Sequence, residues 1–247
     1  MMTRRNKEIV KESYSEIASG DKGCCQCGCD KNDEEKIAEQ IGYSDEEVEK
    51  YDDANMGLGC GNPVALSEIS EGDTVVDLGC GAGFDTFLAS EEVGEEGKVI
   101  GIDMTKEMIE KARKNAEEYE KNNAEFKLGE IEDLPLEDNS VDVIISNCVI
   151  NLSEDKDKVF SEVHRVLRKG GEMYVSDIVL LESLTEEQKG DEDLLVGCVA
   201  GALLKKNYID KIKNAGFEIE ILGEDKEISK RQYQGINLES LKVKAKK

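Results

Sequence analysis

A glycine-rich turn after a short apolar run constrains the fold more than any other feature of this chain. The segment 75–83 reads VVDLGCGAG, in which Gly79, Gly81 and Gly83 follow β-branched residues. Glycine adopts positive φ angles without steric cost and lets the backbone approach a ligand closely, so the segment predicts a strand, a binding turn and a helix. A turn for a dinucleotide pyrophosphate would read G-x-G-x-x-G, but Phe84 stands at the third glycine position. The turn therefore favours another class of ligand.

The chain from Thr74 onward alternates short apolar runs with longer amphipathic segments. Segments 106–120 and 156–167 carry charge on one face and are expected to be helices, the second stopped by Gly170 and Gly171. This alternation predicts an α/β fold with a doubly wound, Rossmann-like sheet, mostly parallel with an antiparallel C-terminal strand. Seven strands are expected, at residues 74–78, 98–103, 125–128, 141–146, 172–177, 217–222 and 238–245.

The first 70 residues are predicted to form a small helical, cysteine-bearing appendage, and residues 71–247 the main domain. Ser44 followed by Glu47 forms a capping box, which predicts a helix start. Asn62 and Pro63 are placed as the cap and first residue of another helix, so Cys60 is expected on a loop that enters it.

Two acidic residues indicate what the glycine turn binds. Asp103 ends the second expected strand, where a carboxylate can accept hydrogen bonds from both hydroxyls of a ribose. Asp77 lies beside the turn and suits a ligand that carries positive charge. Together they favour S-adenosylmethionine over an anionic nucleotide.

The segment 77–171 resembles the class I S-adenosylmethionine-dependent methyltransferases, with DLGCGAG, IDMT, GEIEDLP and VLRKGG in the usual order. The resemblance implies that the turn and both acids bind S-adenosylmethionine, that Met104 packs on its adenine and that Asn147 lies at its methionine end. It also implies that Ile131 and Glu132 flank the adenine edge. A simpler interpretation makes Met104 and Ile131 core residues only.

Sulfur is the unusual chemical resource of this chain, which has eight cysteines and one histidine. Cys148 follows the fourth expected strand, at the sheet edge where ligands of open α/β sheets bind. Cys198 lies among small residues that permit close approach, so these two thiols and that of Cys60 can converge. Three thiolates suit a soft trivalent element such as arsenic. Its lone pair attacks a methyl group without a general base, in keeping with the scarcity of histidine.

Four motifs together, DKGCCQCGC, LGLGCGNP, SNCVINLS and GCVAGAL, are similar to those of the arsenite methyltransferases. The resemblance implies that Cys60, Cys148 and Cys198 bind arsenic(III), and that one of Cys24 and Cys25 takes part in arsenite capture or in a redox disulfide. The choice between Cys24 and Cys25 stays open, because the sequence adds Cys27 and Cys29 nearby. A thioredoxin- or glutathione-type reductant is the implied partner, and arsenic detoxification the implied role.

Alternative interpretations remain for the same residues. One is a methyltransferase for an organic acceptor of the quinone or sterol type, which would need a base such as Asp177 or Glu172. Another is a metalloid-binding protein without catalysis. Cys198 can be a packing residue, Cys80 is interpreted as structural, and the four thiols at 24–29 can bind zinc.

Charge and apolar runs limit partners and location. Lys plus Arg number 32 and Asp plus Glu 56, which gives a formal net charge of −24. This charge repels nucleic acid and anionic lipid, so neither is an expected partner. The apolar runs are too short for a membrane span and we identify no signal peptide, so we expect a cytoplasmic protein with reduced thiols, as a monomer.

Overall fold

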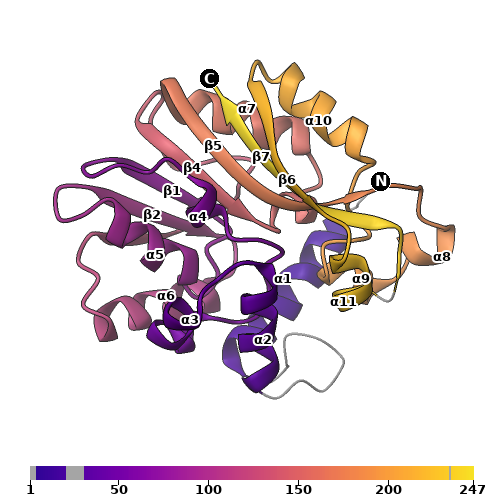
Figure 1. The fold of residues 1–247 in the computed structure, drawn as a ribbon, viewed down its shortest axis with the longest axis horizontal. Coiled ribbons are helices and arrows are strands. Elements are labelled where there is room, and N and C mark those ends of the chain that lie inside the picture. The colour runs from indigo at the N-terminus through magenta and orange to yellow at the C-terminus, as the bar shows by residue number, and fades with distance from the viewer. Residues whose placement is uncertain (1–3, 21–30, 234) are drawn as a thin grey trace.

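A seven-stranded mixed sheet forms the centre of the molecule in the computed structural model, which describes residues 4–20, 31–233 and 235–247. Its strand order is β3-β2-β1-β4-β5-β7-β6 (Figure 1). The strands are β1 (Thr74–Leu78), β2 (Lys98–Asp103), β3 (Ala124–Leu128), β4 (Val141–Asn147), β5 (Leu167–Leu180), β6 (Glu218–Asp225) and β7 (Leu238–Lys246).

Pairing in the sheet confirms the predicted architecture. β1 lies between β2 and β4, and all pairs from β3 to β5 are parallel. β7 runs antiparallel to both of its neighbours, β5 and β6. Parallel order at the centre brings the carboxyl ends of β1, β2 and β4 to one edge, where open α/β sheets bind ligands.

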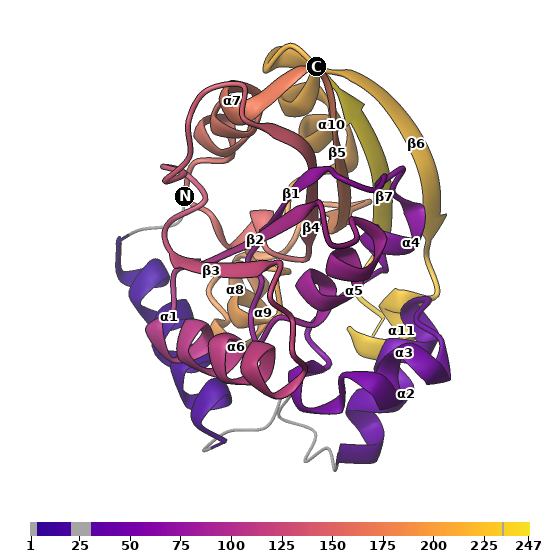
Figure 2. The same cartoon turned by 90° about the vertical axis from the view of Figure 1, so that its left-hand side faces the viewer.

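Helices cover both faces of the sheet and gather at this edge (Figures 1 and 2). Apolar residues of α5 and α6 share one core with the N-terminal helices, whereas those of α7 and α10 form a second core on the other face. The helices are α1 (Arg4–Ser19), α2 (Lys31–Ile41), α3 (Asp45–Lys50), α4 (Pro63–Leu66), α5 (Phe84–Glu92), α6 (Lys106–Glu118), α7 (Lys156–Val166), α8 (Glu186–Lys189), α9 (Glu192–Val196), α10 (Lys205–Asn214) and α11 (Ile228–Gln232), with 3-10 turns at Asp52–Ala54 and Ile150–Leu152.

Helix α7 ends at Val166, one residue before the predicted end, but the glycine pair is not what ends it. Its last residue is Val166, and Leu167 is already extended because it pairs with Val141 at the start of β5. Gly170 adopts a φ of 83° inside this strand, and a Cβ on Gly171 would lie 2.9 Å from the Asp142 carbonyl oxygen. The two glycines therefore permit the irregular start of β5, where its register with β4 shifts. They do not end the helix.

The N-terminal helices pack directly against the sheet domain. α1 lies beside α6 and α9, as Figure 2 shows, and buries Val10 and Ile17. The capping box at Ser44 and Glu47 and the Asn62 cap before Pro63 both form as the sequence predicts. The division at residue 70 into an appendage and a main domain stays a prediction.

Within these described ranges, every helix is too short or too polar to cross a bilayer.

Candidate functional site

A pocket opens at the carboxyl ends of the parallel strands, and the glycine turn forms part of its wall. Its lining comes from the β1–α5 turn, the ends of β2 and β4, helix α1 and the segment 54–59. Residues from both halves of the chain therefore face one cavity.

The glycine turn adopts the geometry that its sequence predicts. Gly79, Gly81 and Gly83 have φ angles of 70°, 52° and 102°. A Cβ on Gly79 would lie 2.4 Å from the side chain of Val149, whereas a Cβ on Gly81 would meet no atom within 4 Å. Gly79 is thus needed for close packing, and the space beside Gly81 is open to a ligand.

Three buried aspartate carboxyl groups line one wall of the pocket. Asp103 accepts hydrogen bonds from the backbone N–H groups of Thr105 (2.8 Å) and Gly81 (3.1 Å), which ties the end of β2 to the turn. Burial, and then the charge of Asp85, raises the pKa of Asp77 to about 8, and burial raises that of Asp85 to about 6. A buried carboxyl with a raised pKa gains from a nearby positive charge, so this wall suits a cationic ligand.

The other wall holds the residues expected beside an adenine. Met104, Ile131 and Glu132 all line the pocket, and Glu132 accepts a hydrogen bond from Ser153 at 2.8 Å. Lys7 of α1 makes an ion pair with Glu132 at 3.4 Å, so α1 is held across this end.

Three cysteines come together at the pocket, and Cys148 is one of its lining residues. Cys60, Cys148 and Cys198 are all free thiols, and each is at most 4% exposed. Cys148 follows β4 and Cys198 follows α9, and both have left-handed backbone, with φ angles of 57° and 65°. The Cys198 thiol donates a hydrogen bond to the Cys148 carbonyl oxygen at 2.6 Å. Non-glycine residues in this conformation are strained, and such strain concentrates at functional sites.

The surroundings shift the pKa values of the three thiols in different directions. Interactions with the neighbouring thiols of Cys198 and Cys60 lower the pKa of Cys148 well below its usual value. Burial and the interaction with Cys148 raise the pKa of Cys60. The interaction of Cys198 with Cys148, together with burial, raises the pKa of Cys198. Of the three thiols, Cys148 thus loses its proton most readily, and the thiolate is the form that binds soft elements.

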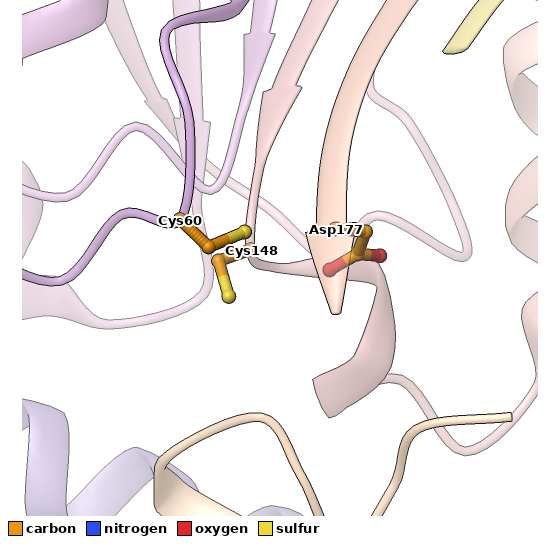
Figure 3. Close-up of side chains that lie close together, drawn as sticks. All are labelled: Cys60, Cys148 and Asp177. Carbon is orange, nitrogen blue, oxygen red and sulfur yellow. The ribbon is translucent and has the colours of Figure 1, made fainter. Parts of the chain in front are cut away.

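Asp177 is a fourth member of this cluster. Its carboxylate oxygen and the Sγ atoms of Cys60 and Cys148 all lie within 4.8 Å of one another. Figure 3 shows the Cys60 thiol directed toward Asp177, with one carboxylate oxygen directed back toward the two thiols. Sequence reasoning considered Asp177 only as a base for a different reaction.

Asn147 connects the thiols to the pocket. Its Oδ1 accepts a hydrogen bond from the Cys60 backbone N–H at 3.0 Å. Its Nδ2 donates to the hydroxyl of Tyr43 at 2.9 Å, to the Gly61 carbonyl at 2.8 Å and to Asp85 at 3.0 Å. One side chain thus fixes the Cys60 loop against the acids of the pocket.

Several contributors were not found by sequence reasoning. Tyr43 donates a hydrogen bond to Asp85 at 2.5 Å, and Tyr14 and Tyr233 each interact with the thiol cluster. The only sequence feature that could have identified Asp85 is its position, two residues after the last glycine of the turn. The predicted roles of Cys24 and Cys25 fall outside the described residues and stay predictions. Cys80 is buried in the glycine turn, apart from this cluster.

The pocket fits S-adenosylmethionine. It offers open space over Gly81, carboxyl groups for a cationic ligand, and apolar contacts from Met104 and Ile131 on the opposite wall. Asp103 uses one oxygen for each backbone N–H group and keeps lone pairs for ribose hydroxyls.

Comparisons with known proteins agree with this chemistry. The model of a methyltransferase domain family matches residues 69–216. An arsenite methyltransferase from Halobacterium salinarum is 45% identical over 231 residues, which are 89% of this chain and 59% of that protein. The arsenite methyltransferase of Homo sapiens is 40% identical over 168 residues, 64% of this chain and 44% of that protein. The chain thus spans about half the length of these curated relatives.

A solved structure extends the likeness to three dimensions. The crystal structure of an arsenic(III) S-adenosylmethionine methyltransferase from Chlamydomonas reinhardtii is 35% identical, with a TM-score of 0.62, over 85% of this chain and 72% of that one. This likeness and the match to the family model confirm the predicted class I methyltransferase fold. The chain belongs to the family of S-adenosylmethionine-dependent methyltransferases that includes the arsenite methyltransferases.

Proposed function

We propose that this protein transfers a methyl group from S-adenosylmethionine to trivalent arsenic held by cysteine thiols. The observation that carries the proposal is the convergence of Cys60, Cys148 and Cys198 beside a pocket whose walls fit S-adenosylmethionine. The names of the relatives from Halobacterium salinarum and Chlamydomonas reinhardtii support arsenic as the acceptor.

In this proposal the glycine turn, Asp77 and Asp103 hold the cofactor, with Met104, Ile131 and Glu132 around its adenine and Asn147 at its methionine end. The cofactor supplies a methyl group on a positively charged sulfur. The three thiols replace the hydroxyl groups of arsenite, which leave as water, and the arsenic lone pair stays free as the nucleophile. The acceptor atom carries no proton, so these residues need only position it and exclude water.

Two further elements belong to the proposal. One of Cys24 and Cys25 captures arsenite or forms a redox disulfide. A thioredoxin- or glutathione-type reductant then reduces this disulfide. Free thiols at Cys60, Cys148 and Cys198 suit a reducing cytoplasm, which we propose as the location.

The proposal is tested by turnover of the purified protein with arsenite, S-adenosylmethionine and a thiol reductant. We expect methylated arsenicals, separated by chromatography and identified by elemental detection. S-adenosylmethionine binding without any methylarsenic product would reject arsenite as the acceptor.

Asp177 favours a second candidate, a methyltransferase for an organic acceptor that must lose a proton. This carboxyl group is buried next to Cys148, and burial and the charge of Cys148 raise its pKa well above the usual value, which suits a base. The two candidates predict opposite results with arsenite: under the second, arsenite neither turns over nor protects Cys148 from thiol reagents.

A further inference from the structure

The tightest set of ligand atoms in the described residues is not the three thiols. It consists of the thiols of Cys60 and Cys148 and a carboxylate oxygen of Asp177, which lie within 4.8 Å of one another (Figure 3). Cys198 is outside this group, and its thiol is turned to the Cys148 carbonyl oxygen at 2.6 Å. Cys60 and Cys148 therefore belong to two possible ligand sets, which differ in whether the third member is sulfur or oxygen.

Two sulfurs and a carboxylate oxygen are donors that zinc-like cations accept. Zinc binds cysteine sulfur at about 2.3 Å and carboxylate oxygen at about 2.0–2.2 Å in tetrahedral geometry, which places neighbouring donors roughly 3.6–3.8 Å apart. Donors already within 4.8 Å reach that geometry by shifts of about 1 Å. Arsenic(III), in contrast, is satisfied by three soft sulfurs and has no need of the oxygen.

Asp177 is held as metal-binding carboxylates are held. Asn151 donates a hydrogen bond to its Oδ1 at 3.1 Å, and the Tyr208 hydroxyl donates to its Oδ2 at 2.8 Å. All three side chains are fully buried. Hydrogen bonds of this kind fix the orientation of a ligand and leave further lone pairs on each oxygen for the cation.

The buried charges balance for a divalent ion. Two thiolates and one carboxylate carry three negative charges, so a divalent cation leaves one. Burial lowers the pKa of Lys156 to about 8, so its ammonium form still predominates at pH 7, and its interaction with Asp177 offsets the remaining charge. A neutral buried assembly avoids the cost of burying an unpaired charge.

We propose that Cys60, Cys148 and Asp177 form a binding site for a thiophilic divalent cation such as Zn²⁺ or Cd²⁺, which competes with arsenite for the two shared thiols. Each of the two thiols and the Asp177 carboxyl group releases to water any proton that it still holds when the ion binds, and no oxidation or reduction occurs. The site makes the protein sensitive to these ions through Cys60 and Cys148, without occupying the glycine-turn side of the pocket. The inference concerns binding alone, so it does not depend on methyl transfer.

The test is a titration with Cd²⁺, followed by the ultraviolet thiolate-to-cadmium charge-transfer band, in a phosphine reductant. The full chain carries Cys24→Ser, Cys25→Ser, Cys27→Ser and Cys29→Ser, so that those thiols do not compete. We expect one Cd²⁺ per chain, and arsenite should displace it. Asp177→Asn should weaken Cd²⁺ binding by about tenfold or more, because even loss of an outer partner costs that much.

Cys198→Ser is the matched control, because it removes a neighbouring sulfur that belongs to the other ligand set. It should change Cd²⁺ affinity by less than about threefold while it weakens arsenite binding by about tenfold or more. Asp177→Asn should show the reverse pattern. Equal Cd²⁺ affinity in Asp177→Asn and the parent, or an equal loss in Cys198→Ser, would overturn the proposal.

Folding of each variant is checked by its affinity for S-adenosylhomocysteine. If Asp177→Asn does not fold, Tyr208→Phe replaces it, since this change removes only the hydroxyl that orients the carboxylate. Tyr208→Phe should then weaken Cd²⁺ binding and leave arsenite binding unchanged, and unchanged Cd²⁺ binding would reject the site. Arsenite methylation can fail in the turnover assay without altering any of these outcomes.

Discussion

The cofactor pocket and the thiol cluster are neighbours, but the chain builds them in different ways. The glycine turn and the three aspartates of the pocket come from one continuous stretch, β1, the turn, α5 and β2, in which Asp77 and Asp103 lie 26 residues apart. The thiol cluster collects Cys60, Cys148 and Cys198 from three distant segments. A local site depends on turn geometry, whereas a site of distant parts depends on the tertiary packing around it.

If the two regions act separately, a change in the cluster should abolish transfer without loss of cofactor binding. Cys148→Ser removes the thiol that ionises most readily in the cluster and should lower methyl transfer to arsenite by at least about a hundredfold, because the acceptor is no longer held in line. S-adenosylhomocysteine affinity, measured by calorimetry, should stay within about twofold of the wild type. A wild-type rate in this variant would remove Cys148 from the mechanism.

Two glycine substitutions separate packing from ligand space within the pocket. Gly79→Ala should lower the free energy of unfolding by about 3 kcal/mol, since its Cβ meets Val149 at 2.4 Å in addition to the strain of a positive φ. Gly81→Ala should lower it by only about 1–2 kcal/mol, from φ strain alone, but its Cβ enters the ligand space and should weaken cofactor binding. Urea unfolding and calorimetry measure both quantities. Equal stability losses would contradict the packing difference.

The acids of the pocket should make its stability depend on pH. The pKa of Asp77 is raised to about 8, so the folded state holds a proton that the unfolded state releases near pH 4. This contribution to stability is present below pH 4 and is lost as the pH rises to 8. Asp77→Asn cannot titrate, so without cofactor it should exceed the wild type by on the order of 5 kcal/mol at pH 8 and match it at pH 4. A difference that does not change with pH would contradict the raised pKa.

Backbone strain in the thiol cluster should appear as a small stability difference between two variants. Cys198 has a φ of 65°, which glycine adopts freely and alanine does not. Cys198→Gly should therefore be about 1 kcal/mol more stable than Cys198→Ala, although both lack the thiol and both should lose arsenite affinity. Denaturant unfolding of the pair provides the measurement. A more stable Cys198→Ala would show that the left-handed backbone carries no strain.

The same contrast explains what the sequence could predict. The seven strands and the glycine turn follow from local periodicity and residue type, and six of the seven expected strands match to within three residues at either end. β5 is longer than expected because its irregular start, with Gly170 at positive φ, depends on pairing with β4. Pairing with a distant strand leaves no pattern in the segment itself.

The thiol cluster shows the limit of the same reasoning. Its cysteines were identifiable because the residue type is rare and the motifs have known relatives. Asp177 and Asn147 are common residue types, and their parts in the cluster follow only from the hydrogen bonds and distances of the folded chain. Such partners cannot be found from spacing, because nothing in the local sequence sets them apart.

The position of β7 has a consequence for the newly made chain. β7 separates β5 from β6, although the ribosome synthesises it after both, so these strands stay unpaired on that side until residues 238–246 emerge. Ser240 of this strand donates a hydrogen bond to the Cys60 carbonyl oxygen at 2.7 Å, which ties the cluster to the same late event. During translation the thiols are therefore present before the architecture that arranges them.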